Sequence, residues 1–139
     1  MTSIASTTAL SDERRIEFLR RNYQAYNRCD FDAVIEMAHP DIVLVRAGRQ
    51  GEIRGRAAVR AWLEPDAFES QRLDPIKFRL TADKAMVHVR GTLRGAGSGI
   101  EMEVWSWAVW TFDAADRVTR IEVFLDHEHA EAERALRAA

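Results

Sequence analysis

Several features that would narrow the function class are scarce in this sequence. Cys29 is the only cysteine, so no disulfide can form within the chain, and this usage is typical of a reducing compartment. Neither sign of charge dominates, because 20 basic residues are balanced by 22 acidic residues and the formal net charge is −2. Nucleic acid and anionic membranes are therefore not expected as partners.

Long apolar runs are also missing. No stretch approaches the roughly 18 apolar residues that a membrane-spanning helix needs. The first ten residues, MTSIASTTAL, lack the basic segment followed by an apolar core that marks a secretory signal. We therefore expect a cytoplasmic protein in which residues 1–10 form a loose tail and residues 11–139 form one domain.

Hydrophobic periodicity divides the chain into a helical half and a strand-rich half. A serine or an aspartate stands where most of the helices should begin, which is typical of helix caps. In the second half, alternating apolar and polar residues separated by turn residues predict an antiparallel meander. The order of elements predicts an α+β domain. The predicted elements are helices from Ser11, from Asp30 to Pro40, at 55–63 and from Asp126, and strands at 41–48, 76–81, 85–93, 100–112 and 117–125.

The strand at 100–112 carries large apolar side chains on both faces. Its even-numbered side chains, from Ile100 to Phe112, are apolar nearly throughout and are expected to face the core or a cavity. The odd-numbered side carries the indoles of Trp105 and Trp107, which must also be shielded from water by another part of the structure. We expect a second copy of the chain to provide it, in a homodimer through the convex face of the sheet. The alternative is that the C-terminal helix or the N-terminal tail folds over the two indoles.

Three stretches resemble the SnoaL-like proteins of the NTF2-like superfamily, from about residue 12 to the end of the chain. The resemblance implies a conical α+β barrel, in which a strongly curved antiparallel sheet is wrapped by about three helices of the N-terminal half and a short C-terminal helix. It also implies a pocket inside the cone and dimers through the open sheet face. The stretches are YQAYNRCDFDAVIEMAHPDIVLV, GRAAVRAWL and RGAGSGIEMEVWSWAVWTFDAADRVTRIEVFLDHEHAEAERAL.

The superfamily holds several activities, so fold alone does not assign one. Ketosteroid isomerases carry a base carboxylate on the first strand, and the resemblance places Arg46 there. Their oxyanion-hole acid falls near Ala108 and their tyrosine donor near Asn22. The isomerase residues are therefore absent at the aligned positions.

His88 and Arg90 are the candidate catalytic residues. Arg90 matches the arginine of limonene epoxide hydrolases, but Thr92 and Val123 stand at that family's two aspartate positions. His88 and Arg90 lie two apart on a predicted strand and so share a face, which the resemblance implies is the concave one. Histidine titrates near neutral pH and can transfer a proton, and a guanidinium can hold an enolate or carboxylate oxygen.

The expected pocket is cationic, has an aromatic wall and suits a small oxygenated organic molecule. Neither a metal nor a cofactor is expected, since His127 and His129 are two apart on a predicted helix and point to different sides. The expected substrate-binding residues are Tyr26, Arg46, Trp62, Thr92, Ser106 and Trp110.

Two main function classes stay open at this point. The first is a cofactor-free isomerase, polyketide cyclase-like enzyme or lyase, in which His88 takes a proton and Arg90 stabilises an enolate oxygen. The second is a non-catalytic small-molecule-binding or structural dimer, which the missing family carboxylates favour. In the second reading, His88 and Arg90 are an ordinary structural pair on the sheet. An interaction module that uses the aromatic convex face is a further alternative.

Overall fold

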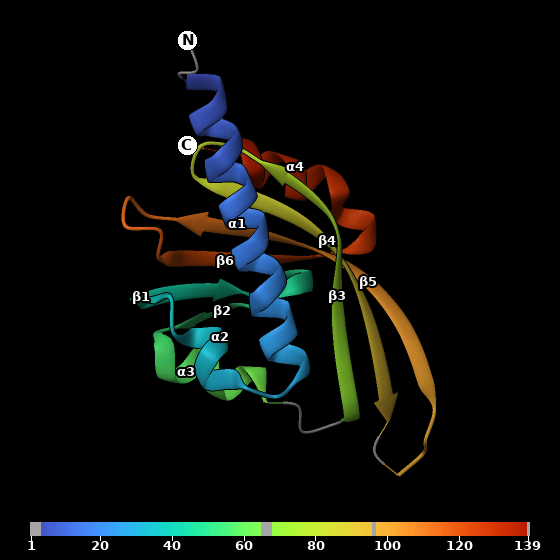
Figure 1. The fold of residues 1–139 in the computed structure, drawn as a ribbon. Helices are drawn as coiled ribbons and strands as arrows, with labels where there is room; N and C mark the ends of the chain where they lie inside the picture. The colour runs from blue at the N-terminus through green and yellow to red at the C-terminus, as the bar shows by residue number, and fades with distance from the viewer. Residues whose placement is uncertain (1–3, 65–67, 96, 139) are drawn as a thin grey trace.

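The computed structural model describes residues 4–64, 68–95 and 97–138. Within them, four α-helices and two short 3₁₀-helices accompany one six-stranded sheet (Figure 1). The helices are α1 (Ile4–Asn27), α2 (Phe31–Ile35), η1 (Ala47–Arg49), α3 (Arg56–Leu63), η2 (Asp126–Glu128) and α4 (His129–Arg137). The strands are β1 (Ala38–Val45), β2 (Glu52–Arg54), β3 (Phe68–Leu80), β4 (Lys84–Gly95), β5 (Glu101–Phe112) and β6 (Val118–Leu125).

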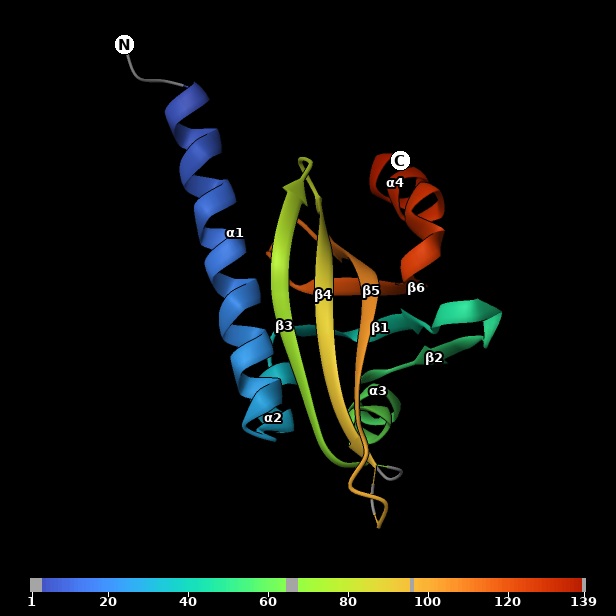
Figure 2. The ribbon, with the colours of Figure 1, turned by 90° about the vertical axis from the view of Figure 1, so that its right-hand side faces the viewer.

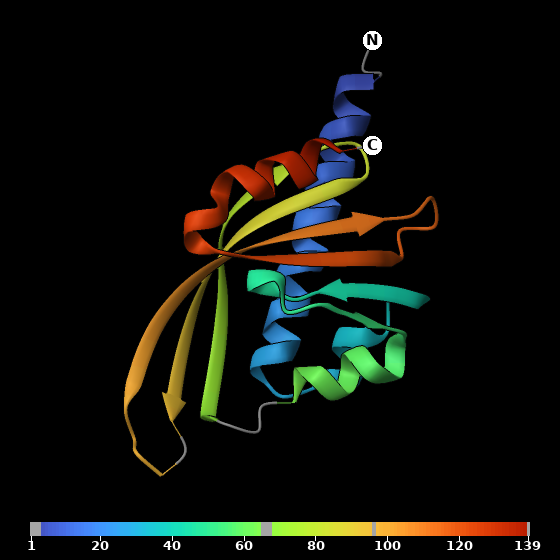
Figure 3. The same ribbon diagram turned by 180° about the vertical axis from the view of Figure 1, so that it is seen from behind.

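The strands lie in the order β2-β1-β6-β5-β4-β3. The predicted meander from β3 to β6 is confirmed, since its neighbours all pair antiparallel. The sheet as a whole is mixed, because β1 runs parallel to β6. It is strongly curved and open (Figure 3). The expected α+β cone is therefore confirmed, with the correction that one strand pair is parallel. Two strands so far apart in the chain have no connecting turn from which their relative direction could be read.

The helices are divided between the two faces of the sheet. Helix α1 runs alongside β3, and α2 and α3 lie across the concave side (Figures 1 and 2). Helix α4 packs on the opposite, convex side against β4, β5 and β6. Each face consequently has its own apolar core. The concave core includes Leu19, Ile42, Leu44, Val59, Val87 and Trp110, and the convex core contains Met86, Val109, Ala132 and Leu136.

The N-terminal half begins its helices differently from the prediction. Asp30 caps α2 as expected, because its carboxylate accepts a backbone N–H of that helix at 3.2 Å. Ser11 does not begin a helix, since α1 is already helical from Ile4; residues 1–3 of the predicted tail lie outside the described residues. Pro40 lies inside β1 and not at a helix end. None of the described helices is long and apolar enough to cross a membrane.

The C-terminal helix does not begin with an Asp126 cap. Asp126 opens η2, and the carboxylate of Glu128 accepts the backbone N–H of Leu125 at 2.8 Å. At the far end of α4, the buried Lys84 ammonium donates to the Ala135 carbonyl at 2.9 Å. A cation at this position also complements the negative end of the helix. Helix α4 is thereby tied to the sheet near both of its ends.

We predict that Leu136→Ala destabilises the protein by about 2–4 kcal/mol, because it leaves a cavity in the convex core. Leu136 is only 3% exposed. Urea unfolding followed by circular dichroism measures the loss. The control is Arg134→Ala on the solvent side of α4, which should change the free energy of unfolding by no more than about 0.5 kcal/mol. Equal effects of the two substitutions would contradict the packing of α4 on the sheet.

Candidate functional site

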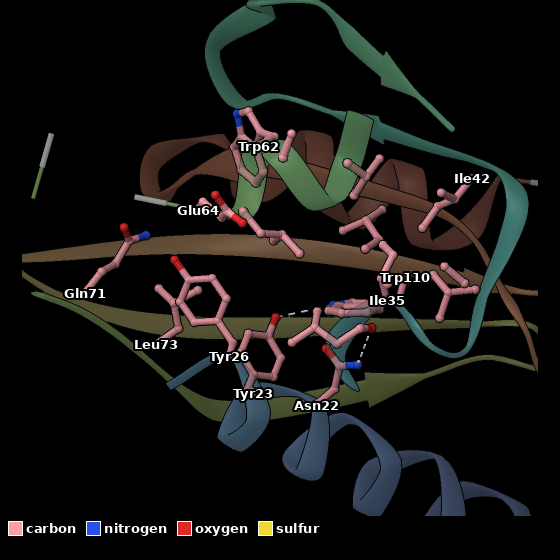
Figure 4. Close-up of a pocket in the computed structure, with 17 residues that line it drawn as sticks. Asn22, Tyr23, Tyr26, Ile35, Ile42, Trp62, Glu64, Gln71, Leu73 and Trp110 are labelled. Carbon is pink, nitrogen blue, oxygen red and sulfur yellow. Dashed lines mark hydrogen bonds between the residues drawn. The ribbon is translucent and has the colours of Figure 1, made fainter. Parts of the chain in front are cut away.

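A cavity of about 490 Å³ lies between the concave face of the sheet and helices α1, α2 and α3 (Figure 4). This volume is in the range of small-molecule sites. Most of the side chains that line it are apolar, and the lining comes from seven different helices and strands. They include Val34, Ile35, Ile42, Val59, Leu73 and Ile121.

Tyr23 and Trp110 provide the best-defined polar feature of the cavity. The Trp110 indole N–H donates to the Tyr23 hydroxyl at 3.3 Å, and the two rings pack edge to face with their centroids 5.8 Å apart. A hydroxyl that accepts one hydrogen bond can still donate its own hydrogen. Among the described residues, we find no protein acceptor for that hydrogen. The Tyr23 hydroxyl is therefore available to donate to an oxygen atom bound in the cavity.

Both tyrosines of the chain line this cavity and stay protonated well beyond neutral pH. Burial raises the pKa of Tyr23 well above its ordinary value, and the hydrogen bond from Trp110 offsets only part of this effect. Burial also raises the pKa of Tyr26 to about 12, with a smaller contribution from Cys29. Both phenols are consequently hydrogen-bond donors and not bases under ordinary conditions.

Helix α3 and strand β3 contribute further polar side chains. Trp62 and Glu64 line the cavity from the end of α3, and Gln71 lines it from β3 (Figure 4). The Glu64 carboxylate accepts from the Arg60 guanidinium at 2.8 Å. It is the only carboxylate that lines the cavity among the described residues, and none of the described cationic side chains does so. The lining is therefore apolar and aromatic rather than cationic.

Three of the predicted substrate-binding residues line the cavity, namely Tyr26, Trp62 and Trp110. Two others lie elsewhere for identifiable reasons. The Arg46 guanidinium donates to the carbonyl of Gln50 within its own loop. Thr92 pairs with Glu103 across β4 and β5, which places it on the convex face.

Ser106 is on the concave side but does not line the cavity. It is half-buried and stands opposite Val89 and Leu125 in the sheet. Ser106 precedes Trp110 on β5 and stands in a different row of the sheet, since Trp110 faces Ala85 and Ile121. The Ser106 hydroxyl is therefore not among the polar groups that line the cavity.

The expectation that His88 points into the cavity is wrong. His88 stands opposite Trp107 across β4 and β5, and residues that face each other in this way share a side of the sheet. The imidazole stacks on the Trp107 indole with centroids 3.8 Å apart, and its Nε2 lies 2.9 Å from a carboxylate oxygen of Asp126. The neighbours of His88 in the strand, Val87 and Val89, are the buried ones.

Arg90 shares the convex face with His88. Its guanidinium lies 3.6 Å from the Asp74 carboxylate and 4.0 Å from that of Glu103. Neither His88 nor Arg90 lines the cavity. Trp105 and Trp107 are half-buried on the same face, and the His129 ring of α4 stacks on Trp107 at 4.1 Å. The C-terminal helix thus covers part of the aromatic face, and a homodimer through the remainder stays a prediction.

Tyr23 is a lining residue that the sequence did not predict. Its neighbour Asn22 also lines the cavity, and the Asn22 amide donates to the Val34 carbonyl at 3.0 Å and ties α1 to α2. The spacing of Tyr23 and Tyr26 on one helical stripe was the available signal. It did not show which ring places its hydroxyl in a cavity. Across the described residues, no group of three or more histidine, cysteine or acidic side chains is arranged to hold a metal ion.

The SnoaL-like domain family matches residues 19–121. Among solved structures, the epoxide hydrolase/cyclase-like enzyme SalBIII, of pyran ring formation in salinomycin, has a TM-score of 0.74 and 17% identity, over 82% of this chain and 92% of its own. TerC, co-crystallized with polyporic acid, has a TM-score of 0.68 and 22% identity, over 87% and 95%. A Mycobacterium tuberculosis protein in complex with estradiol-17beta-hemisuccinate has a TM-score of 0.67 and 13% identity, over 78% and 90%. No curated protein matches the chain by sequence.

We predict that the two tyrosines ionise later in the native protein than in the unfolded chain. Native Tyr26 should ionise near pH 12 and Tyr23 later still, while the unfolded chain should ionise near pH 10. Because only the unfolded chain loses these protons between these pH values, native stability should fall as pH rises from about 10 to about 12. Tyrosinate absorbance after a rapid pH jump measures this, and Tyr23→Phe isolates Tyr26. A native midpoint near 10 for both phenols would contradict their burial.

Proposed function

The chain belongs to the SnoaL-like domain family, and we propose that its cavity binds a neutral and largely apolar organic molecule with one oxygen acceptor. The family and its structural neighbours support small-molecule binding of a cyclase-like kind. The single observation that carries the finer proposal is the Tyr23 hydroxyl, which accepts from Trp110 and lines an apolar cavity. Tyr26 and Trp62 are the proposed aromatic contacts of the ligand.

The charges around the cavity favour a neutral ligand over an anionic one. His88, Arg90 and Arg46, which would have made the pocket cationic, do not line it. The Glu64 carboxylate lies at its lining instead. An anion would lose its hydration in the apolar interior without gaining a cationic partner, which is unfavourable. A ketone, ether or similar acceptor needs only one donor, and Tyr23 supplies it.

Glu64 favours a second candidate function, which is conversion of the same ligand. A carboxylate and a phenol that line one cavity can act as a base and as a donor to a developing oxyanion. The second candidate is therefore a cofactor-free isomerase, cyclase or lyase in which Glu64 takes a proton and Tyr23 polarises the acceptor oxygen. Glu64→Gln separates the candidates. An enzyme converts the ligand and loses this turnover in the variant, whereas a binding protein converts no ligand and keeps its affinity nearly unchanged.

We predict that 4′-ethylacetophenone binds in the cavity and that Tyr23→Phe weakens its binding by about two- to tenfold, the worth of one hydrogen bond of about 0.5–1.5 kcal/mol. Isothermal titration calorimetry measures both affinities. The hydrocarbon isostere, in which the carbonyl becomes a methylene, should bind the two proteins equally. The anion 4-ethylbenzoate should bind the native protein more weakly than the ketone.

His88→Gln serves as the matched control, because His88 lies on the other side of the sheet. It should leave the affinity for 4′-ethylacetophenone unchanged. Circular dichroism checks that Tyr23→Phe is folded, since the substitution leaves the buried Trp110 N–H without its acceptor. An affinity that depends on His88 and not on Tyr23 would overturn the assignment. Preference for the benzoate would overturn the neutral ligand class.

A further inference from the structure

We propose that the concave face of β4 and β5 continues the cavity as an apolar shelf, which holds a hydrocarbon tail of the ligand. The shelf consists of Leu93, Ile100, Met102 and Val104. This inference rests on the proposed function, because it assigns a second part to the same ligand. The ligand is accordingly an elongated molecule, with an oxygenated head in the cavity and an alkyl or acyl chain on the shelf.

In the outer half of β5, exposed apolar side chains alternate with charged ones. Ile100, directly before β5, and Met102 and Val104 within it are 63%, 46% and 44% exposed. They alternate with Glu101 and Glu103, which stand opposite Arg94 and Thr92 on the convex face. The charged side chains of this arm therefore face away from the domain, and the apolar ones face the concave side. Large apolar side chains exposed at alternate positions of one arm commonly mark a binding surface.

Cross-strand pairing connects this surface to the cavity. Leu73 stands opposite Gly91, and Gly91 stands opposite Val104, so these residues form one row across three strands. Leu73 lines the cavity at one end of the row, and exposed Val104 lies at the other. Neighbouring strands are about 4.8 Å apart, so the two ends are about 10 Å apart. The next row, through Gln71, Leu93 and Met102, repeats the arrangement, and Gln71 also lines the cavity.

Gly91 keeps the first row free of an obstacle. A Cβ at this position would lie 3.1 Å from the Val104 carbonyl oxygen and 3.4 Å from a methyl group of Leu73. The first distance is tighter than ordinary contact, so a side chain here would displace its neighbours. Because residue 91 is a glycine, the side chain of Leu73 can lie against its backbone. No side chain then projects from the sheet between Leu73 and Val104.

The chemistry of the two rows identifies the occupant. Leu73, Gly91 and Val104 are apolar, and the second row adds only the neutral Gln71 to Leu93 and Met102. No charged side chain belongs to either row, so nothing there would pair with a charged or strongly polar group. Trp62, on the α3 side of the cavity, is 44% exposed and adds aromatic surface where the lining ends. A saturated chain that leaves the cavity over Leu73 meets apolar surface along its course.

A series of 4′-alkylacetophenones from ethyl to pentyl tests the shelf by calorimetry. Complete burial of a methylene strengthens binding about fourfold. A chain lying on an open surface is covered on roughly one side, so we expect about twofold per methylene beyond the ethyl compound. The test variant is Met102→Gln combined with Val104→Thr, which keeps side-chain size and makes the shelf polar. In this variant, affinity should rise much less with chain length, while the ethyl compound should bind as it does to the native protein.

Glu103→Gln on the same strand is the matched control, because it faces the convex side. It should retain the full dependence on chain length. Binding of the ethyl compound with equal chain-length dependence in the native protein and in the shelf variant would overturn the shelf and leave the proposed function intact. Failure of every ketone to bind would overturn the proposed function itself. Sedimentation that shows a native dimer converted to monomer by the shelf variant would also overturn the proposal, since a second copy would then occupy the surface.

Discussion

The pairing register between β4 and β5 determines which side chains can reach a ligand. It places His88 opposite Trp107 and Val87 opposite Ala108. In a strand, a shift of one residue would exchange the two faces. The buried pair, Val87 and Ala108, faces the cone, so the imidazole and the indole must lie outside it. The same register carries the rows that run from the cavity lining to the outer half of β5.

The hydrogen-bonded tyrosine and tryptophan of the cavity come from α1 and from one strand of the sheet. Helix α1 presents Tyr23 and Tyr26 at a spacing of three residues, so both rings project to the same side. β5 presents Trp110, whose N–H holds the hydroxyl of Tyr23. Burial then keeps both phenols protonated. The result is a donor fixed in an apolar surrounding, where a single hydrogen bond to a neutral ligand has more effect than it has in water.

The convex face has a different physical character. Trp107 lies between the rings of His88 and His129, and its indole N–H donates to the Asp126 carbonyl at 3.0 Å. Arg90, on the same face, lies within ion-pair distance of carboxylates from β3 and β5. These contacts join the end of β6 and the beginning of α4 to the centre of the sheet. His88 is therefore one of the residues that attach α4 to the sheet, whereas Arg90 pairs with carboxylates of neighbouring strands.

The sequence by itself determined the family, the order of the elements, the Asp30 cap and the apolar concave side of β5, because these depend on local caps, turns and the alternation of neighbouring residues. It also identified Tyr26, Trp62 and Trp110 as residues that line the cavity. In β4, the apolar Val87, Val89 and Leu93 alternate with the polar His88, Arg90 and Thr92, so the alternation itself favours an outward imidazole, and the inward placement followed only from the resemblance. Only the tertiary structure decided what the imidazole meets on the convex face. The contact between His88 and Asp126 joins residues 38 positions apart, and it exists because the sheet's curvature and the end of β6 bring them together.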